Sequence, residues 1–319
     1  MHLTDYAEVK NLWWPIEGRL KEPVPELLKF PRYLEIETVN ACNARCPMCT
    51  IDDWDRRDGL MKDDIFGKIA DEIGEHRDEV RRVALYRDGE PLLDKKLAAR
   101  VFALKDREVK RVGISTNAAL LTEEKAEALL LAGLDEIILS VDSLQPMTYE
   151  AIRVGLDFDE VMLNCIRFIG MRDLMMSDCQ IWVRMIRQES NKNEWPQFEA
   201  FWRSHLRPTD RVDYRNIHNW GSQLVSFKPV STANVEKPCV ALWSLMVIFA
   251  NGDVPLCNVD YHLKHKKGNV REYSIKELWT QQYGDERVAH LEGRRESICK
   301  GCTVWSEEAN SMTVEKIAA

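Results

Sequence analysis

Residues 42–49 read CNARCPMC and directly follow an alternating apolar run, Tyr33–Val39, that predicts a strand. A loop of thiolates that follows a strand, with spacings of three and then two residues, can fold around an iron–sulfur cluster. Three protein ligands for a cluster of four irons leave one iron without a protein ligand. Because an open iron can bind a substrate or a cofactor, we expect this loop to be a reaction centre.

Zinc is the alternative interpretation of the same loop. Clustered cysteines can form half of a zinc site or a redox pair. Structural zinc sites usually contain paired Cys-x-x-Cys units or nearby histidines, and no histidine lies between Cys42 and His76. The spacing therefore favours an open cluster over zinc.

The composition is that of a globular protein. The 319 residues carry a net charge of −8, with 45% hydrophobic and 30% charged residues. No run of Lys and Arg marks a nucleic-acid surface, and no apolar stretch reaches the roughly 20 residues that span a bilayer. Residues 1–20 lack the apolar segment of a signal peptide. We expect a soluble, cytoplasmic protein without a nucleic-acid or membrane partner, whose cysteines are ligands and not disulfides.

Strand-like and helical stretches alternate along most of the chain. The expected strands are Tyr33–Val39, Arg82–Tyr86, Arg111–Ser115, Glu136–Val141, Gln180–Ile186 and Val212–Ile217. The expected helices between them are Lys62–His76, Lys95–Lys105, Thr122–Ala132, Phe158–Met175 and Asn193–His205. This alternation predicts an α/β protein with a parallel sheet, curled into a partial (βα)6 barrel. Its chemistry should lie at the C-terminal ends of the strands.

The chain is expected to contain three segments. They are an N-terminal extension over 1–30, the partial barrel over 31–225 and a small C-terminal domain over 226–319. In the C-terminal domain we expect a linker over 227–237, followed by a β-hairpin of residues 243–249 and 254–256. The hairpin is expected because Asn251-Gly252 favours a hairpin turn. One helix is expected from Ser274 to about His290, with a capping box at its start.

Polar clusters follow the first four expected strands. They are the cysteine loop, Asp88-Gly89-Glu90-Pro91, Ser115-Thr116-Asn117 and Ser140-Val141-Asp142. Any of the last three alone would be read as an ordinary turn. Four such clusters, each directly after one of four consecutive strands, indicate that their side chains share one pocket.

These features resemble the radical S-adenosylmethionine (SAM) enzymes over about residues 33–222. The family's cysteine loop resembles Cys42, Cys46 and Cys49, and its Gly-Gly-Glu-Pro motif resembles residues 88–91, with Asp88 in place of the first glycine. The resemblance implies a [4Fe–4S] cluster on the three cysteines and SAM bound over its open iron. It assigns the methionine amino group to Gly89 and Glu90, the ribose region to Ser115 and Asn117, a further cofactor contact to Ser140 and the SAM carboxylate to Arg153.

The resemblance also implies the chemistry. One electron, from a donor such as flavodoxin or ferredoxin, cleaves SAM to a 5′-deoxyadenosyl radical that takes hydrogen from an unactivated carbon. The protein orients the substrate and excludes water.

A second set of four cysteines lies in the C-terminal domain. They are Cys239, Cys257, Cys299 and Cys302. Four thiolates suit zinc or a four-cysteine cluster, and by themselves they favour zinc slightly. Behind a radical SAM domain they resemble the SPASM extension in its shortened "twitch" form, because no cysteine follows Cys302. The resemblance implies one auxiliary [4Fe–4S] cluster with no open iron, suited to electron transfer.

Two cysteines remain, Cys165 and Cys179. A radical epimerase needs a hydrogen donor, often a thiol, but both residues are expected to be ordinary buried side chains. A dehydrogenase instead needs groups that bind and deprotonate a hydroxyl. The candidates at the last two strand ends are Arg184, Arg187, Tyr214, Arg215, Asn216 and His218, with Arg215 the first choice, followed by Arg184 and Tyr214.

The preferred function is therefore a radical SAM oxidoreductase acting on a small polar substrate. Oxidation of a secondary alcohol of a sugar or aminocyclitol, as in antibiotic biosynthesis, is the expected reaction, with the auxiliary cluster accepting an electron. The alternatives within the family are an epimerase of a sugar or peptide residue and a peptide-modifying maturase. The alternative from another class is a zinc-binding interaction protein.

Overall fold

The computed structural model describes residues 23–217, 220–221, 223, 238–295, 297–300, 302 and 304. It also describes the backbone of the short paired strands β1 (Trp13–Trp14) and β2 (Gly18–Arg19). His218 and the linker expected over 227–237 lie outside these residues. No helix in the described part of the chain is long and apolar enough to cross a membrane.

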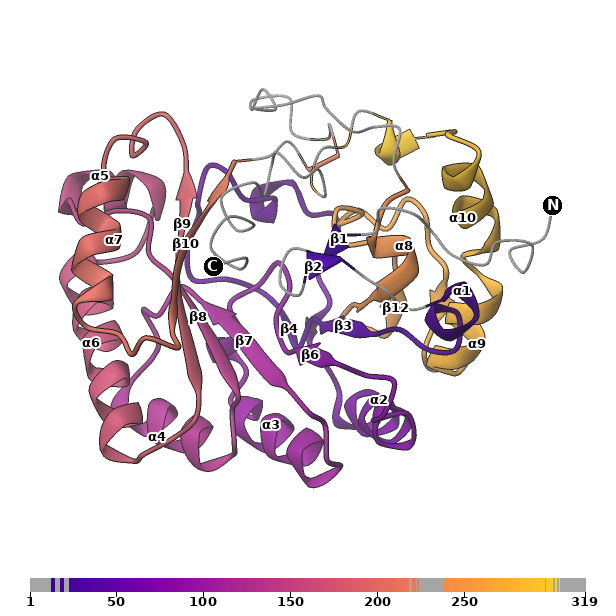
Figure 1. Cartoon of the computed structure of the whole chain (residues 1–319), viewed down its shortest axis with the longest axis horizontal. Helices are drawn as coiled ribbons and strands as arrows, with labels where there is room; N and C mark the ends of the chain where they lie inside the picture. Colours follow the sequence, from indigo (N-terminus) through magenta and orange to yellow (C-terminus); the bar gives the residue numbers. More distant parts are fainter. Residues whose placement is uncertain are drawn as a thin grey trace.

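A parallel seven-stranded sheet, curved into an open barrel, forms the centre of the molecule (Figure 1). Its strand order is β10-β9-β8-β7-β6-β3-β11. The strands are β3 (Tyr33–Ile36), β6 (Arg82–Ala84), β7 (Val112–Thr116), β8 (Glu136–Ser140), β9 (Gln180–Arg187), β10 (Arg211–Asn216) and β11 (Leu245–Ile248). The first six are the expected strands, in chain order across the sheet, so the partial barrel is confirmed.

Helices cover the outside of the curved sheet (Figure 1). They are α2 (Asp63–Glu75), α3 (Leu97–Asp106), α4 (Glu123–Leu131), α5 (Pro146–Ile152), α6 (Phe158–Leu174) and α7 (Trp195–Arg203). Five of them match the predicted helices, and α5 was not predicted. The Thr122 side chain caps α4 by accepting from the Lys125 N–H at 3.3 Å, and Gly133 follows the helix with a φ of +83°.

The predicted C-terminal hairpin is wrong. β11 pairs in parallel with β3, opposite Tyr33 to Ile36, while β12 (Asp253–Val254) pairs with β13 (Gly268–Asn269). All four residues of β11 are buried, as in a strand covered on both faces and unlike a hairpin strand with one wet face. A segment expected in the second domain therefore extends the sheet of the first.

The single helix expected from Ser274 to His290 is also wrong, because the chain breaks it into α9 (Ile275–Gln281) and α10 (Gly284–Leu291). The predicted capping box at Ser274 and Glu277 is confirmed. At the break, the buried Tyr283 donates its hydroxyl to the carbonyl of Pro255 at 3.1 Å. Two further short α-helices in the described residues are α1 (Val24–Leu27) and α8 (Ala241–Ser244).

Candidate active site

The cysteine loop is closed at its base by two short strands. β4 (Val39–Asn40) pairs with β5 (Gly59–Leu60) in an antiparallel ladder, so residues 41–58 form one loop beyond the end of β3. Within it the Cys49 N–H donates to the Cys46 carbonyl at 2.9 Å, and the Ala44 N–H points to the Cys42 sulfur at 3.4 Å. These contacts hold the three thiols on one tight turn.

A cavity of about 210 Å³ opens over this loop. Its lining includes all three cysteines of the loop and all six residues predicted to contact SAM, namely Gly89, Glu90, Ser115, Asn117, Ser140 and Arg153. The side chains of Ser115 and Ser140 lie 3.4 Å apart on adjacent strands. The residues that the sequence assigned to one cluster and one cofactor therefore share one cavity, although their contacts with SAM remain a prediction.

Glu90 ties two of the strand-end motifs together. Its buried carboxylate accepts hydrogen bonds from the Thr116 hydroxyl at 2.7 Å and from the backbone N–H groups of Asn117 at 2.9 Å and Leu92 at 3.0 Å. Burial raises the pKa of Glu90 although these bonds favour the ionised form. Glu90 thus fixes the wall of the cavity before any ligand binds.

Arg153 is held in place beside the cysteine loop. Its Nε donates to Asp142 at 2.7 Å, and Asp142 in turn accepts from the Ile186 N–H at 2.6 Å. The Arg153 Nη1 lies 3.8 Å from the Cys46 sulfur. A fixed guanidinium at this point suits a carboxylate partner next to the cluster loop.

Gly89 allows the motif to approach the cysteine loop closely. A Cβ at this position would lie 2.4 Å from the Val39 carbonyl oxygen and 2.6 Å from that of Ala41. The adjacent Glu90 N–H donates to the same Ala41 carbonyl at 2.8 Å. The absence of a side chain therefore sets the spacing between the motif and the loop.

Replacing Gly89 with alanine should weaken SAM binding about tenfold or more, because the clash costs on the order of 1–3 kcal/mol and displaces the cavity wall. Equilibrium dialysis of reconstituted protein with labelled SAM measures the effect. Gly67→Ala in α2 is the matched control, since a Cβ there meets no atom within 4 Å. Equal affinity of the two variants would contradict the predicted role of the motif.

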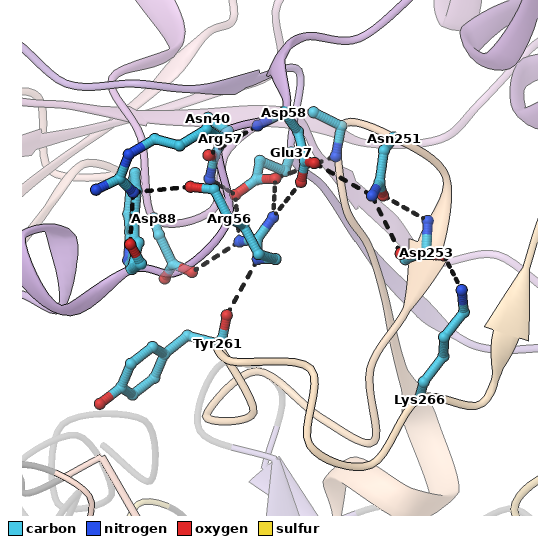
Figure 2. A network of polar contacts seen from close by, with 12 residues as sticks. Glu37, Asn40, Arg56, Arg57, Asp58, Asp88, Asn251, Asp253, Tyr261 and Lys266 are labelled. Atoms are coloured by element: carbon cyan, nitrogen blue, oxygen red, sulfur yellow. Dashed lines mark hydrogen bonds and ion pairs between the residues drawn. The ribbon is translucent and has the colours of Figure 1, made fainter.

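Asp88 takes part in a buried charge network that sequence reasoning missed (Figure 2). Its side chain is fully buried, 3.1 Å from Arg87 Nη2 and 3.9 Å from Arg56 Nη2. Burial raises the pKa of Asp88 to about 6, against the lowering effect of Arg87. The acidic residue in the glycine position is therefore accommodated by two arginines beneath the motif.

Arg56 is the centre of this network (Figure 2). Its two terminal nitrogens donate to the two carboxylate oxygens of Glu37 at 2.9 and 3.0 Å, and its Nε donates to the Tyr261 carbonyl at 3.1 Å. Glu37 also accepts from the Ala250 N–H at 3.0 Å. Asn251 donates to Asp58 at 3.2 Å. The network joins the end of the cysteine loop to the C-terminal segment.

The four C-terminal cysteines are brought together. Burial first, and then the thiols of Cys302 and Cys299, raise the pKa of Cys239 to about 12. The pKa of Cys257 is likewise raised by burial and then by Cys239. Four thiols gathered in this way fit the ligand set of a four-cysteine iron–sulfur cluster.

The catalytic candidates differ in their placement. Arg184 is paired with Asp213 through two hydrogen bonds of 2.8 and 2.7 Å. Tyr214 packs edge-on against Trp195 of α7, on the helix side of β10, and is not part of the cavity lining, so its catalytic role stays a prediction. Arg215 lies on the opposite face of β10 from Tyr214, in register with Ile186, which lines the cavity.

Arg215 forms no hydrogen bond or ion pair with any described residue. Burial, and then the nearby Arg184, lower its pKa to about 10, so its guanidinium is charged at neutral pH. Arg215 is not part of the cavity lining, but it lies on the same face of the sheet as the lining residue Ile186, where a charged group without a described partner is suited to bind a polar ligand group. Sequence reasoning also missed Tyr86 and Trp220, which line the cavity; Tyr86 lies directly before the Asp88 motif and could have been found.

The two remaining cysteines are buried away from the cavity, as expected. Cys165 in α6 is 0% exposed and Cys179, just before β9, is 2% exposed. Burial raises the pKa of Cys165 to about 12. Neither residue is part of the cavity lining.

Comparison with known protein families identifies both halves of the site. Residues 36–172 match the radical SAM superfamily, and residues 239–303 match SPASM, an iron–sulfur cluster-binding domain. These matches support the two-cluster interpretation and leave the zinc-binding interaction protein without support. The three thiols of the cavity loop and the four gathered C-terminal thiols are the structural counterparts of the two matches.

Curated relatives are similar over different shares of the chain. A tungsten-containing aldehyde ferredoxin oxidoreductase cofactor-modifying protein of Pyrococcus furiosus is 34% identical over 128 residues, 39% of this chain and 34% of the relative. A GTP 3′,8-cyclase of Limosilactobacillus fermentum is 24% identical over 301 residues, 87% of this chain and 81% of the relative. The chain thus spans about a third of the length of the first relative.

Solved structures share the fold. BtrN, in complex with AdoMet and 2-DOIA, has a TM-score of 0.60 at 20% identity and covers 86% of this chain and 93% of its own. Streptococcus suis SuiB bound to precursor peptide SuiA has a TM-score of 0.64 at 18% identity, and the match covers 87% of this chain and 70% of the SuiB chain. With SAM and iron–sulfur clusters as its cofactors, the chain belongs to the radical SAM superfamily and carries a SPASM iron–sulfur domain behind its partial barrel.

Proposed function

We propose that this radical SAM enzyme is a dehydrogenase that oxidises a secondary alcohol of a small polar substrate. A sugar or an aminocyclitol of the kind used in antibiotic biosynthesis is the preferred substrate. This choice is supported by the similarity to BtrN, whose structure was solved with AdoMet and 2-DOIA. The similarity covers most of both chains. A flavodoxin or ferredoxin is the proposed electron donor.

One observation carries the preference for oxidation over epimerisation. Every cysteine that lines the cavity belongs to the loop at residues 42–49, and the two cysteines outside the cluster sets are buried elsewhere. An epimerase that uses a thiol must return a hydrogen atom to the substrate from such a residue. In the described part of the chain no thiol is free to do so at the cavity.

The residues on the barrel side supply substrate binding. Arg215 is the residue proposed to hold and polarise the substrate hydroxyl, and its neighbour Arg184 is kept in position by Asp213. The pKa of Asp213 is lowered by Arg184 in spite of burial, so this pair stays ionised. When bound, SAM with the cluster at residues 42–49 supplies hydrogen abstraction, and the cluster at the C-terminal cysteines supplies an electron acceptor.

The mass of the product tests the proposal. Anaerobic turnover of 2-DOIA and of a panel of neutral and amino sugars, followed by mass spectrometry, should give a product that lacks two hydrogens, with one SAM consumed per product. The Cys165→Ala and Cys179→Ala variants should retain turnover. A product of unchanged mass, together with loss of turnover in either cysteine variant, would establish epimerisation instead.

A further inference from the structure

Arg87 and Asp88 form a buried ion pair next to the C-terminal cysteines. The Arg87 Nη2 lies 3.1 Å from the Asp88 Oδ1, with the two side chains 8% and 0% exposed. The same nitrogen donates to the backbone carbonyl of Asn258, the neighbour of Cys257. The positive member of the pair is thus anchored on the segment that carries an auxiliary-cluster ligand.

The same pair also reaches the cysteine loop. The Arg87 guanidinium lies 5.6 Å from the ring centroid of Trp220. The Trp220 indole N–H donates to the carbonyl of Met48, next to Cys49, at 3.1 Å. Arg87 and Asp88 therefore lie between two cysteine sets that are far apart in the sequence.

The two charges are anchored on different segments. Asp88 lines the cavity with Cys49 and lies 3.9 Å from Arg56, at the end of the cysteine loop. Arg87 also lines the cavity, but its guanidinium donates to the carbonyl next to Cys257. Asp88 is therefore expected to act more on the SAM-cluster ligands and Arg87 more on Cys257, in surroundings where water screens charges weakly.

We infer that the Arg87–Asp88 pair sets the two iron–sulfur sites to different reduction potentials. A nearby positive charge stabilises a reduced cluster and a negative charge destabilises it. Arg87 therefore raises the potential of the C-terminal site, and Asp88 lowers that of the SAM site. This order favours the C-terminal site as the acceptor of an electron from substrate. The inference rests on the proposed function only for the direction of electron flow.

The test is a redox titration of fully reconstituted protein, monitored by electron paramagnetic resonance at pH 8 without substrate. SAM separates the two signals, because it changes the spectrum of the cluster with an open iron. Arg87→Gln should move the potential of the C-terminal site to more negative values, more than that of the SAM site. Asp88→Asn should move the potential of the SAM site to more positive values, more than that of the C-terminal site. The double variant should bring both potentials back toward the wild-type values.

Matched variants separate charge from geometry. Arg107→Gln and Asp71→Asn make the same changes in an exposed ion pair of 2.7 Å between α3 and α2 and should leave both potentials unchanged. Arg87→Lys keeps the charge and should keep most of the potential difference. Equal shifts in Arg87→Lys and Arg87→Gln, or no shift at either site in Arg87→Gln and Asp88→Asn, would overturn the inference. Because no substrate is present, this result is independent of whether the proposed dehydrogenation is correct.

Discussion

Replacing Cys42, Cys46 and Cys49 together with alanine is expected to abolish SAM cleavage and to leave the C-terminal cluster in place. The three thiols are the cysteines of the loop that lines the cavity, and without thiolate ligands a cluster cannot be held there. Iron should fall from about eight to about four per chain, with sulfide in parallel, since two four-iron clusters become one. Iron and sulfide analysis of anaerobically reconstituted protein measures this directly.

Two control variants make that result specific. Cys165→Ala removes a buried thiol outside both sets and should leave iron, sulfide and SAM cleavage unchanged. Replacing Cys239 and Cys257 should also remove about four irons, but with the cavity loop intact. Eight irons retained in the triple variant, or zinc bound at the C-terminal cysteines of the wild type, would show that the two sets are wrongly assigned.

The parts of the site that could be predicted are those written in short, contiguous motifs. The cysteine spacing, the Gly89-Glu90 motif and the polar residues after β7 and β8 each lie at a strand end, and a parallel sheet brings strand ends together. Local pattern and topology are then sufficient to place them in one cavity. The structure adds that Glu90 already holds the neighbouring motif through Thr116.

The features that were missed depend on partners far away in the sequence. Asn251 contacts Asp58 across 193 residues, and Arg56 contacts the Tyr261 carbonyl across 205. No spacing pattern marks such pairs. The same reason explains β11: its apolar residues fit a hairpin locally, but only the free edge of β3 determines that it joins the main sheet. The placement of Tyr214 and Arg215 has a local cause, since neighbouring side chains of a strand point to opposite faces and the motif alone does not decide which face lines the cavity.

Replacing Arg56 with alanine is expected to give the largest loss of stability of any single substitution considered for this chain. The Arg56 side chain is 8% exposed and its partner Glu37 is 0% exposed. Removing one member of a buried ion pair leaves an uncompensated charge and typically costs about 3–5 kcal/mol. Here Asp58, 2.8 Å away, and Asp88 lose the same counter-charge, and the stacking of the guanidinium on Phe249 at 3.5 Å is lost as well.

The next residue supplies the control. Arg57 is exposed and its Nη1 donates only to the backbone carbonyls of Trp54 and Arg56, so Arg57→Ala should change the free energy of unfolding by less than about 1 kcal/mol. Guanidinium unfolding followed by circular dichroism, under anaerobic conditions, compares the two variants.

Arg56→Ala should also loosen the C-terminal segment, because Arg56 holds the Tyr261 carbonyl and Glu37 holds Ala250. Faster proteolysis near residues 250–265 in Arg56→Ala than in Arg57→Ala would show that this network joins the two halves of the site. Equal unfolding midpoints for the two variants would show that the network adds little, and that the β3–β11 pairing alone holds the halves together.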